Sequence, residues 1–227
     1  MNFGREFKFS LFATPGVDGD EYTIYNTLLC GHAILEYCDI GANIHLGKAA
    51  ELAVRLNISS VPNLLAKVVA DLTANDRFGG KSCTGMAKLC RVLVPYTRIH
   101  LVCLNYARCN DASSLLGSLF DSELNSSLSN VNFKNGKFMG SASIYRGKFD
   151  SSLVENYTKK MRSRQDFNFV DWHPRNVFNS YFSEKGGDSL SAPLSAVQLN
   201  NHTSALEVFG NISERFEQLL EEKKFLD

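Results

Sequence analysis

The sequence shows no bias of charge and no long apolar run. Its 227 residues include 24 basic and 24 acidic side chains, so the formal net charge is zero. Nothing in that balance points to a nucleic acid or to an anionic membrane surface. No stretch approaches the ~20 apolar residues of a membrane span, and the opening MNFGREFKF contains no apolar core of a secretory signal. We therefore expect a cytoplasmic protein that binds neither nucleic acid nor membranes.

Cysteines spaced for a metal or a redox pair are also missing. For scattered cysteines in a reducing compartment, buried free thiols are expected. Cys30 and His32 alone approach the spacing of metal ligands, but on a helix they would point about 200° apart, so we expect no metal site. The six cysteines are Cys30, Cys38, Cys83, Cys90, Cys103 and Cys109.

The histidines give little support to a hydrolytic enzyme. None of the five has a serine or cysteine partner at the spacing of a known nucleophile motif. His100 and His173 stand beside apolar strand residues, which is typical of histidines packed in a core.

The periodicity of apolar residues predicts a mixed α+β fold, a sheet with flanking helices in layers and a terminal helix. Residues 152–155 and 204–207 match the capping box S-x-x-E, and Asn110 or Asp111 is expected to cap the helix that follows it. Strands are expected at 7–13, 99–106, 138–145, 167–172 and 194–199. Helices are expected at 21–36, 48–56, 62–72, between the double glycine at 79–80 and Val94, at 111–120, at 152–162 and from 204 onward.

Six segments in a fixed order resemble the second half of the tubulin family. The first, REFKFSLFATP (5–15), resembles the strand before the family's fifth major helix. TANDRFGG (73–80) followed by LVPYTRIH (93–100) resembles the loop, helix and strand entry through which one tubulin subunit presses on the nucleotide of the next. The other four segments that resemble tubulins are YNTLLCGHAILEYCD (25–39), NGKFMGSASIYRGKF (135–149), FVDWHP (169–174) and LNNHTSALEVF (199–209). The VPY-RIH and FVDW forms, with the later Gly186-Gly187-Asp188, resemble the alpha type.

The resemblance implies three segments: a remnant of the nucleotide-binding domain with the core helix (1–76), the intermediate domain (77–202) and a C-terminal helix (203–227). It also implies that the glycine-rich phosphate loop would lie before Met1, because no segment here matches it. The chain stops before the family's outer helix and acidic tail. The lateral-contact loop (108–118) is short, with serine and leucine in place of an aromatic or histidine lock.

The guanine-contact positions of the family are degenerate here. Gly47-Lys48 falls where tubulins carry Asn-Glu, and Ile58 and Pro62 fall where they carry Tyr and Asn. Ile58 cannot stack as an aromatic ring does, and the Pro62 side chain offers no hydrogen bond. Asn43 or Asn63 could instead be a displaced remnant. We therefore expect no nucleotide binding by this chain alone, and GTP only where a partner subunit supplies it.

The position that polarises water in alpha-type tubulins is also changed. The family's glutamate and nearby aspartate correspond to Lys88 and Gly85, and a lysine cation cannot act as that base. Lys88 is either a stabilising charge beside a partner's phosphate or a solvated surface lysine. The expected longitudinal interface comprises Arg77, Phe78, Gly79, Gly80, Lys81, Lys88 and Arg91.

The favoured interpretation is a non-catalytic tubulin-like protein of the microtubule cytoskeleton. It would dock on the nucleotide face of a beta-type subunit as an end cap or sequestering factor. One alternative is a GTP-binding constituent of microtubules whose N-terminal half is missing from this sequence. Another is a relic fragment, because the strand at 7–13 lacks the neighbours it has in whole tubulins and its edge invites aggregation or a partner.

Overall fold

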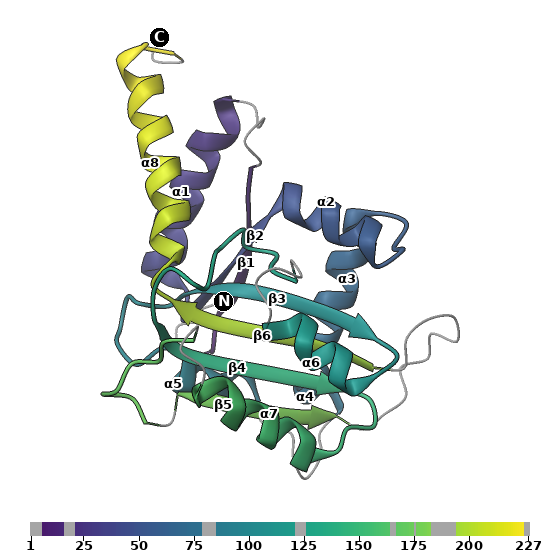
Figure 1. Ribbon diagram of the computed structural model, residues 1–227. Helices are drawn as coiled ribbons and strands as arrows, with labels where there is room; N and C mark the ends of the chain where they lie inside the picture. Colours follow the sequence, from purple (N-terminus) through teal and green to yellow (C-terminus); the bar gives the residue numbers. More distant parts are fainter. Residues whose placement is uncertain are drawn as a thin grey trace.

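The computed structural model describes residues 6–15, 21–78, 85–120, 126–163, 167–174, 176–182 and 194–224 (Figure 1). They form one mixed sheet with helices on both faces, which confirms the predicted α+β class. The six strands are β1 (Phe9–Thr14), β2 (Ile40–His45), β3 (Leu101–Cys109), β4 (Phe138–Arg146), β5 (Val177–Phe182) and β6 (Leu194–His202). The helices are α1 (Glu21–Tyr37), α2 (Leu46–Arg55), α3 (Val61–Leu72), α4 (Ala74–Phe78), α5 (Met86–Leu93), α6 (Ala112–Phe120), α7 (Ser151–Ser163) and α8 (Ala205–Glu221).

The strand order is β1-β2-β3-β6-β4-β5. The pairs β1–β2, β2–β3 and β4–β5 are parallel, whereas β6 runs antiparallel to both β3 and β4. β6 is buried along its whole length, as expected of a central strand. The sheet is continuous across residue 76, because β2 pairs with β3. The division into segments 1–76, 77–202 and 203–227 stays a prediction.

Each face of the sheet covers its own core. One face packs against α2, α3 and α5, with Leu64, Val68 and Leu89 fully buried. The opposite face packs against α6 and α7, with Leu115 and Leu116 fully buried. Figure 1 shows α6 and α7 in front of the sheet and α3 and α5 behind it. A third cluster, around Phe138, Phe133 and Val131, lies near the start of α8.

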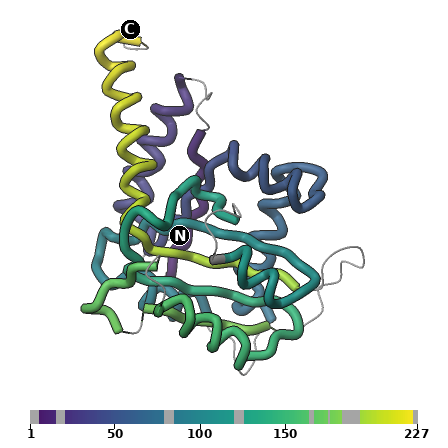
Figure 2. The backbone as a smooth tube through the Cα atoms, viewed as in Figure 1, coloured from purple at the N-terminus to yellow at the C-terminus, as the bar shows by residue number. Residues whose placement is uncertain are grey.

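Helices α1 and α8 pack side by side and extend away from the sheet (Figure 2). The Tyr25 ring meets the Phe216 ring edge-on at 5.3 Å, and the Tyr25 hydroxyl donates to the carbonyl of Lys224 at 3.0 Å. The Lys224 ammonium pairs with Glu21 at 2.5 Å. Phe12 of β1 stacks on Phe209 of α8 at 6.2 Å, which joins the helix pair to the sheet.

Most predicted elements are confirmed, but one strand is wrong and two were not predicted. Residues 167–172 make only a single bridge, between Phe169 and Phe138. Phe167 and Phe169 instead pack their rings on Phe138, at 5.9 and 5.1 Å. The strand beside β4 is β5, and β2 lies between β1 and β3; neither was expected.

Helix caps also differ from the sequence pattern. α7 begins at Ser151, and the Asp150 carboxylate accepts the Ser152 backbone N–H at 3.0 Å, so the predicted box at 152–155 is wrong. The Ser204 hydroxyl donates to the Asn135 carbonyl and makes no cap on α8. The cap by Asp111 is confirmed, since its carboxylate accepts the Ser114 N–H at 3.0 Å.

The expectation of buried thiols holds for one cysteine in the described part of the chain. Cys103 is buried, and burial raises its pKa to about 12. Cys30 is exposed, and Cys38, Cys90 and Cys109 are half-buried; Cys83 lies outside the described residues. The core packing predicted for His100 is confirmed: it is buried, with its ring Nε2 3.3 Å from the Ile34 carbonyl. His173 is only half-buried.

Candidate functional site

Asp76, the middle residue of α4, contacts the start of α5, although residues 79–84 between the two helices lie outside the described part of the chain. Its carboxylate oxygens accept the Met86 backbone N–H, the first of α5, at 3.3 and 3.4 Å. A Cβ at Gly85 would stand 2.9 Å from the Asp76 Oδ1, so glycine leaves room for the carboxylate at the start of α5. The family resemblance expects an aspartate at position 85. Here the residue is Gly85, and the start of α5 is capped instead by the Asp76 carboxylate from another segment.

Helix α5 is seated closely on the sheet. A Cβ at Gly140 of β4 would stand 2.4 Å from the Val92 carbonyl oxygen, so only glycine allows this approach. The Asn201 amide donates to the Leu93 carbonyl at 2.7 Å and to the Ile99 carbonyl at 2.8 Å. Since Asn201 belongs to the buried strand β6, the end of α5 and the turn after it are held by the core.

The solvent side of α5 carries positive charge. Lys88 and Arg91, one helical turn apart, are both exposed. Within the described residues neither side chain makes an ion pair. Tyr96, three residues beyond α5, and Trp172, from the segment 167–174, are 59% and 52% exposed, with ring centroids 5.4 Å apart. An exposed aromatic pair beside a basic helix face is the composition of a protein-interaction surface.

Arg77 and Phe78 lie at the other end of this surface. The Arg77 guanidinium donates to the Thr73 hydroxyl at 3.0 Å and to the Ala70 carbonyl at 2.5 Å, and it stands 4.6 Å from the Phe78 ring centroid. Phe78 stacks on Phe182 of β5 at 5.4 Å and remains 47% exposed. The Arg77 side chain is therefore folded back against the C-terminal end of α3. Gly79, Gly80 and Lys81 lie outside the described residues.

A buried polar cluster holds α3 and α4 to the sheet. Asp71, at the end of α3, pairs with the Arg146 guanidinium at 2.6 Å and accepts from the Tyr106 hydroxyl at 3.3 Å. Burial, with the Asp71 charge, raises the pKa of Tyr106. The Asn75 amide of α4 donates to the Ser180 hydroxyl at 2.8 Å. We call Arg77, Phe78, Lys88 and Arg91 the basic surface. The helices α3 and α4 at one end of it are held to the sheet by these buried polar contacts.

The predicted guanine-contact positions are spread over two helix starts. Gly47 is exposed, and Lys48 pairs with Glu51 at 2.8 Å. Ile58 packs against the main core, and Pro62 is exposed in the first turn of α3. Of the two displaced candidates, Asn43 is buried within β2 and Asn63 is exposed, donating to the Ser59 hydroxyl at 2.7 Å.

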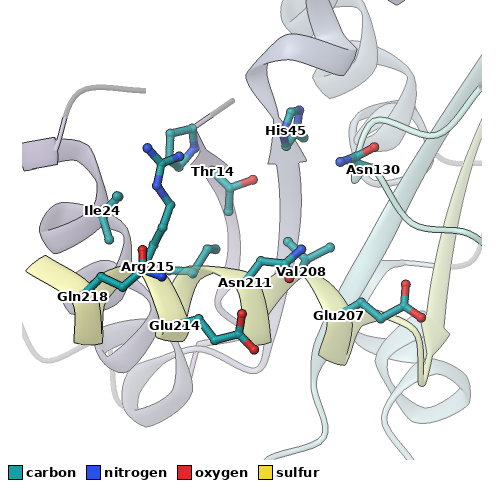
Figure 3. A pocket seen from close by; sticks show the side chains of 12 residues that line it. Thr14, Ile24, His45, Asn130, Glu207, Val208, Asn211, Glu214, Arg215 and Gln218 are labelled. Atoms are coloured by element: carbon teal, nitrogen blue, oxygen red, sulfur yellow. The ribbon is translucent and has the colours of Figure 1, made fainter. Parts of the chain in front are cut away.

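An open cleft of about 500 Å³ lies between the ends of β1 and β2 and the side of α8 (Figure 3). His45, at the end of β2, caps α2 by accepting the Lys48 N–H at 3.2 Å, and burial lowers its pKa, helped by the Lys48 charge. The helix side contributes the carboxylates of Glu207 and Glu214 and the single guanidinium of Arg215. Phosphate groups require converging N–H donors or cations. The helix side of the cleft thus offers two carboxylates and one guanidinium, and the expectation that this chain alone binds no nucleotide stays a prediction.

Sequence reasoning missed the residues that organise the surface. Asp76 lies inside the matched TANDRFGG segment, but nothing in the pattern indicates that it reaches across the loop to Met86. Asp71 stands one residue before the buried Leu72, and its partners Tyr106 and Arg146 come from two distant strands. Tyr96 and Trp172 were noted only as parts of motifs. Among the described residues, no helix is long and apolar enough to span a membrane, and no three potential metal ligands lie close together.

Comparison with known proteins gives a consistent result. Residues 93–214 match the tubulin C-terminal domain. The tubulin beta-2 chain of Suillus bovinus is 30% identical over 96% of this chain and 52% of its own length. The tubulin beta-2 chain of Emericella nidulans is 27% identical over 96% of this chain and 51% of its own. The tubulin alpha-3 chain of Zea mays is 24% identical over 100% of this chain and 55% of its own.

The chain thus spans about half the length of the relatives it matches. Both beta and alpha chains are among them, and the alpha-type resemblance stays a prediction. The domain match covers more than half of the sequence and contains β3 to β6, which form the centre and one edge of the sheet. The chain belongs to the tubulin family and corresponds to its C-terminal half.

Proposed function

We propose that this chain is a non-catalytic tubulin-family protein that docks on the nucleotide face of a beta-type tubulin subunit. The observation that carries the proposal is the basic side of α5, where Lys88 and Arg91 are exposed on a helix that Gly140 and Asn201 fix to the sheet. A rigid helix loses little conformational freedom on binding, so its charges act at defined positions. The chain would accordingly act with microtubules, as an end cap or a sequestering factor.

The charge of the surface favours this partner. A phosphate-bearing face is negative, and Lys88 and Arg91 would meet it with cations that have no intramolecular counter-ion among the described residues. Tyr96 and Trp172 supply the large apolar contact area that usually dominates binding energy, while charges set orientation and association rate. GTP would belong to the partner subunit, and this chain would need no cofactor of its own.

Lys88 is the reason that we propose a non-catalytic role for this chain. Hydrolysis across a tubulin contact, as the family resemblance implies it, needs a carboxylate at this position to orient or deprotonate water. An exposed ammonium group has no lone pair with which to accept that proton. The neighbouring carboxylate of Asp76 is already engaged with the Met86 N–H. The cation would stabilise a phosphate without activating the water.

The test combines microtubule growth with co-sedimentation. We expect the 227-residue protein to slow or stop growth at one end and to pellet with assembled tubulin. Arg91→Glu places a negative charge against the partner's phosphate-bearing face and should weaken binding at least about fivefold, the size of an interfacial charge effect. Lys159→Glu, at an exposed lysine on α7, is the control and should bind as the native chain does. Unchanged growth at saturating protein, or equal binding by both variants, would refute the proposal.

A second candidate is a GTP-binding constituent of microtubules whose phosphate-binding half lies outside this sequence. The observation that favours it is the extent of the match, which covers 96% or more of this chain but only about half of each relative. Mapping transcripts upstream of the Met1 codon distinguishes the two. A glycine-rich loop in frame would favour this candidate, as would polymer assembly that depends on GTP bound to the same chain.

A further inference from the structure

A row of polar side chains crosses the sheet on the side of α6 and α7. The strand registers place Asn105 of β3 opposite Gln198 of β6. They also place Ser143 of β4 between Gln198 and Asn179 of β5. Residues opposite each other on paired strands point to the same side of the sheet, and Tyr145, two residues after Ser143, packs on the cluster under α6 and α7. We call Asn105, Gln198, Ser143 and Asn179 the polar row.

The polar row is buried, although a sheet face covered by helices is normally apolar. Asn105, Gln198 and Ser143 are 2%, 1% and 0% exposed, and Asn179 is half-buried. A buried amide or hydroxyl that lacks a hydrogen-bond partner destabilises the fold, so such groups are nearly always paired. Three buried atoms of the row nevertheless have no partner among the described residues: Asn105 Oδ1, Ser143 Oγ and Asn179 Oδ1.

The protein partners of the two asparagines fix the direction of their amides. The Asn105 amide nitrogen donates to the Leu119 carbonyl of α6 at 3.3 Å, and a carbonyl can only accept. The Thr158 hydroxyl of α7 donates to the Val154 carbonyl at 2.9 Å, so it accepts from the Asn179 amide nitrogen at 3.2 Å. Both amides therefore leave an acceptor oxygen, and the polar row lacks hydrogen-bond donors.

The polar row lies beneath the junction of two helices. α6 packs on β3 and β6, whereas α7 reaches β5 through Thr158. An open cleft of about 380 Å³ on the outside is lined by Ser113 of α6 and by Leu153 and Tyr157 of α7. Leu153 and Tyr157 pack on the same cluster as Tyr145. Burial raises the pKa of Tyr145 and the Ser143 hydroxyl lowers it, so the two hydroxyls are neighbours, but neither has a described partner at hydrogen-bond distance.

Strand spacing identifies the class of ligand. β6 and β4 lie between β3 and β5, so Asn105 and Asn179 are on the order of 14 Å apart across the sheet. A metal ion holds its oxygen ligands within about 2.6 Å, so one ion cannot join the two amide oxygens. Water molecules donate two hydrogen bonds each and bond to one another, so a short chain of them supplies the missing donors along the row.

We propose that the polar row binds a chain of ordered water molecules, which donate to Asn105 Oδ1 and Asn179 Oδ1 and bond to the Ser143 hydroxyl between them. These waters exchange with solvent through the cleft between α6 and α7. The site lies on the opposite face of the sheet from α5, so it does not depend on the proposed contact with tubulin.

The first test is a crystal structure of the 227-residue chain at a resolution that shows ordered water. We expect density for water about 2.7–3.2 Å from Asn105 Oδ1, Ser143 Oγ and Asn179 Oδ1, without any added ligand. The second test is urea unfolding of variants. The two tests are independent, because the first needs no variant and the second needs no crystal.

Ser143→Ala distinguishes a hydrated row from a dry one. If water bonds to the Ser143 hydroxyl, the variant loses that bond, and its urea midpoint should fall by about 0.3 M. In a dry row the same change removes an unpaired buried hydroxyl, and the midpoint should rise. Ser129→Ala is the matched control, because Ser129 is equally buried but its hydroxyl donates to the Asn43 carbonyl at 2.6 Å. Its midpoint should fall in both cases.

Three outcomes would overturn the proposal. The first is a polar row without ordered water in a crystal that shows water elsewhere. The second is a urea midpoint that is higher for Ser143→Ala than for the native chain while Ser129→Ala lowers it. The third is density for a metal ion or for a single organic molecule along the row, because the site would then take another class of ligand.

Discussion

Acid should destabilise this protein through His202, at the end of β6. Its side chain is 1% exposed and lies edge-on to Phe138 and Phe133, with ring centroids 4.4 and 5.1 Å away. Its Nδ1 accepts the Ser204 N–H at 3.1 Å, and its Nε2 has no partner among the described residues. The ring is therefore held neutral, and burial lowers its pKa from 6.5 to about 4.

Proton linkage gives the sign and the size of the change in the free energy of unfolding. In the unfolded chain His202 binds a proton as the pH falls through 6.5, whereas in the folded chain it does so only near 4. The unfolded state then binds more protons between these values, so stability falls as the pH falls. The loss from this residue alone is about 2 kcal/mol between pH 7 and pH 5, and about 3 kcal/mol by pH 4.

The assay is urea unfolding at pH 7, 6 and 5, comparing the native chain with His202→Asn. Asparagine does not titrate, and its carbonyl oxygen can accept the N–H two residues on, as His202 does. All other titrating groups are shared, so the difference between the two curves isolates His202. We expect the native chain to lose about 2 kcal/mol more than the variant from pH 7 to pH 5. Parallel pH dependence of the two proteins would refute the reasoning.

Two further substitutions test the contacts that hold α3, α4 and α5 to the sheet. Asp71→Asn leaves the Arg146 guanidinium without its counter-charge, and we expect a loss of about 3 kcal/mol in urea unfolding, with a smaller loss when Arg146→Met is added. Gly140→Ala puts a methyl group 2.4 Å from the Val92 carbonyl, so α5 must shift. Gly140→Ala should lower the free energy of unfolding by about 2 kcal/mol and should also weaken binding to tubulin. A variant as stable as the native chain would contradict this close approach.

Periodicity predicted the helices well because each one presents a continuous apolar side to the sheet. In α3, for example, Leu64, Val68 and Leu72 are buried at intervals of one turn. Strands that pair along their whole length, such as β4 and β6, were predicted for the same kind of reason. In these elements the residues that form the apolar pattern are also the ones buried in the core. The sequence alone is therefore sufficient to predict them.

The strand predictions are wrong where a segment packs its side chains on the core without pairing its backbone, or pairs without a clear apolar pattern. Residues 167–172 alternate as a strand does, but Phe167 and Phe169 use their rings to cover Phe138 and form no ladder. β2 was not predicted because Gly41 and Asn43 interrupt its apolar run, and it exists because β1 and β3 flank it on both sides. Neither result can be read from a window of neighbouring residues.

The candidate surfaces depend on such long-range contacts even more strongly. The resemblance to tubulins identified Lys88 and Arg91, but not Asp76 contacting the start of α5 or Asn201 holding α5 from β6. Phe78 shows the same dependence, because it stacks on Phe182 of β5, an edge strand that the sequence did not predict. One end of the basic surface is therefore fixed by an element that no local pattern indicated.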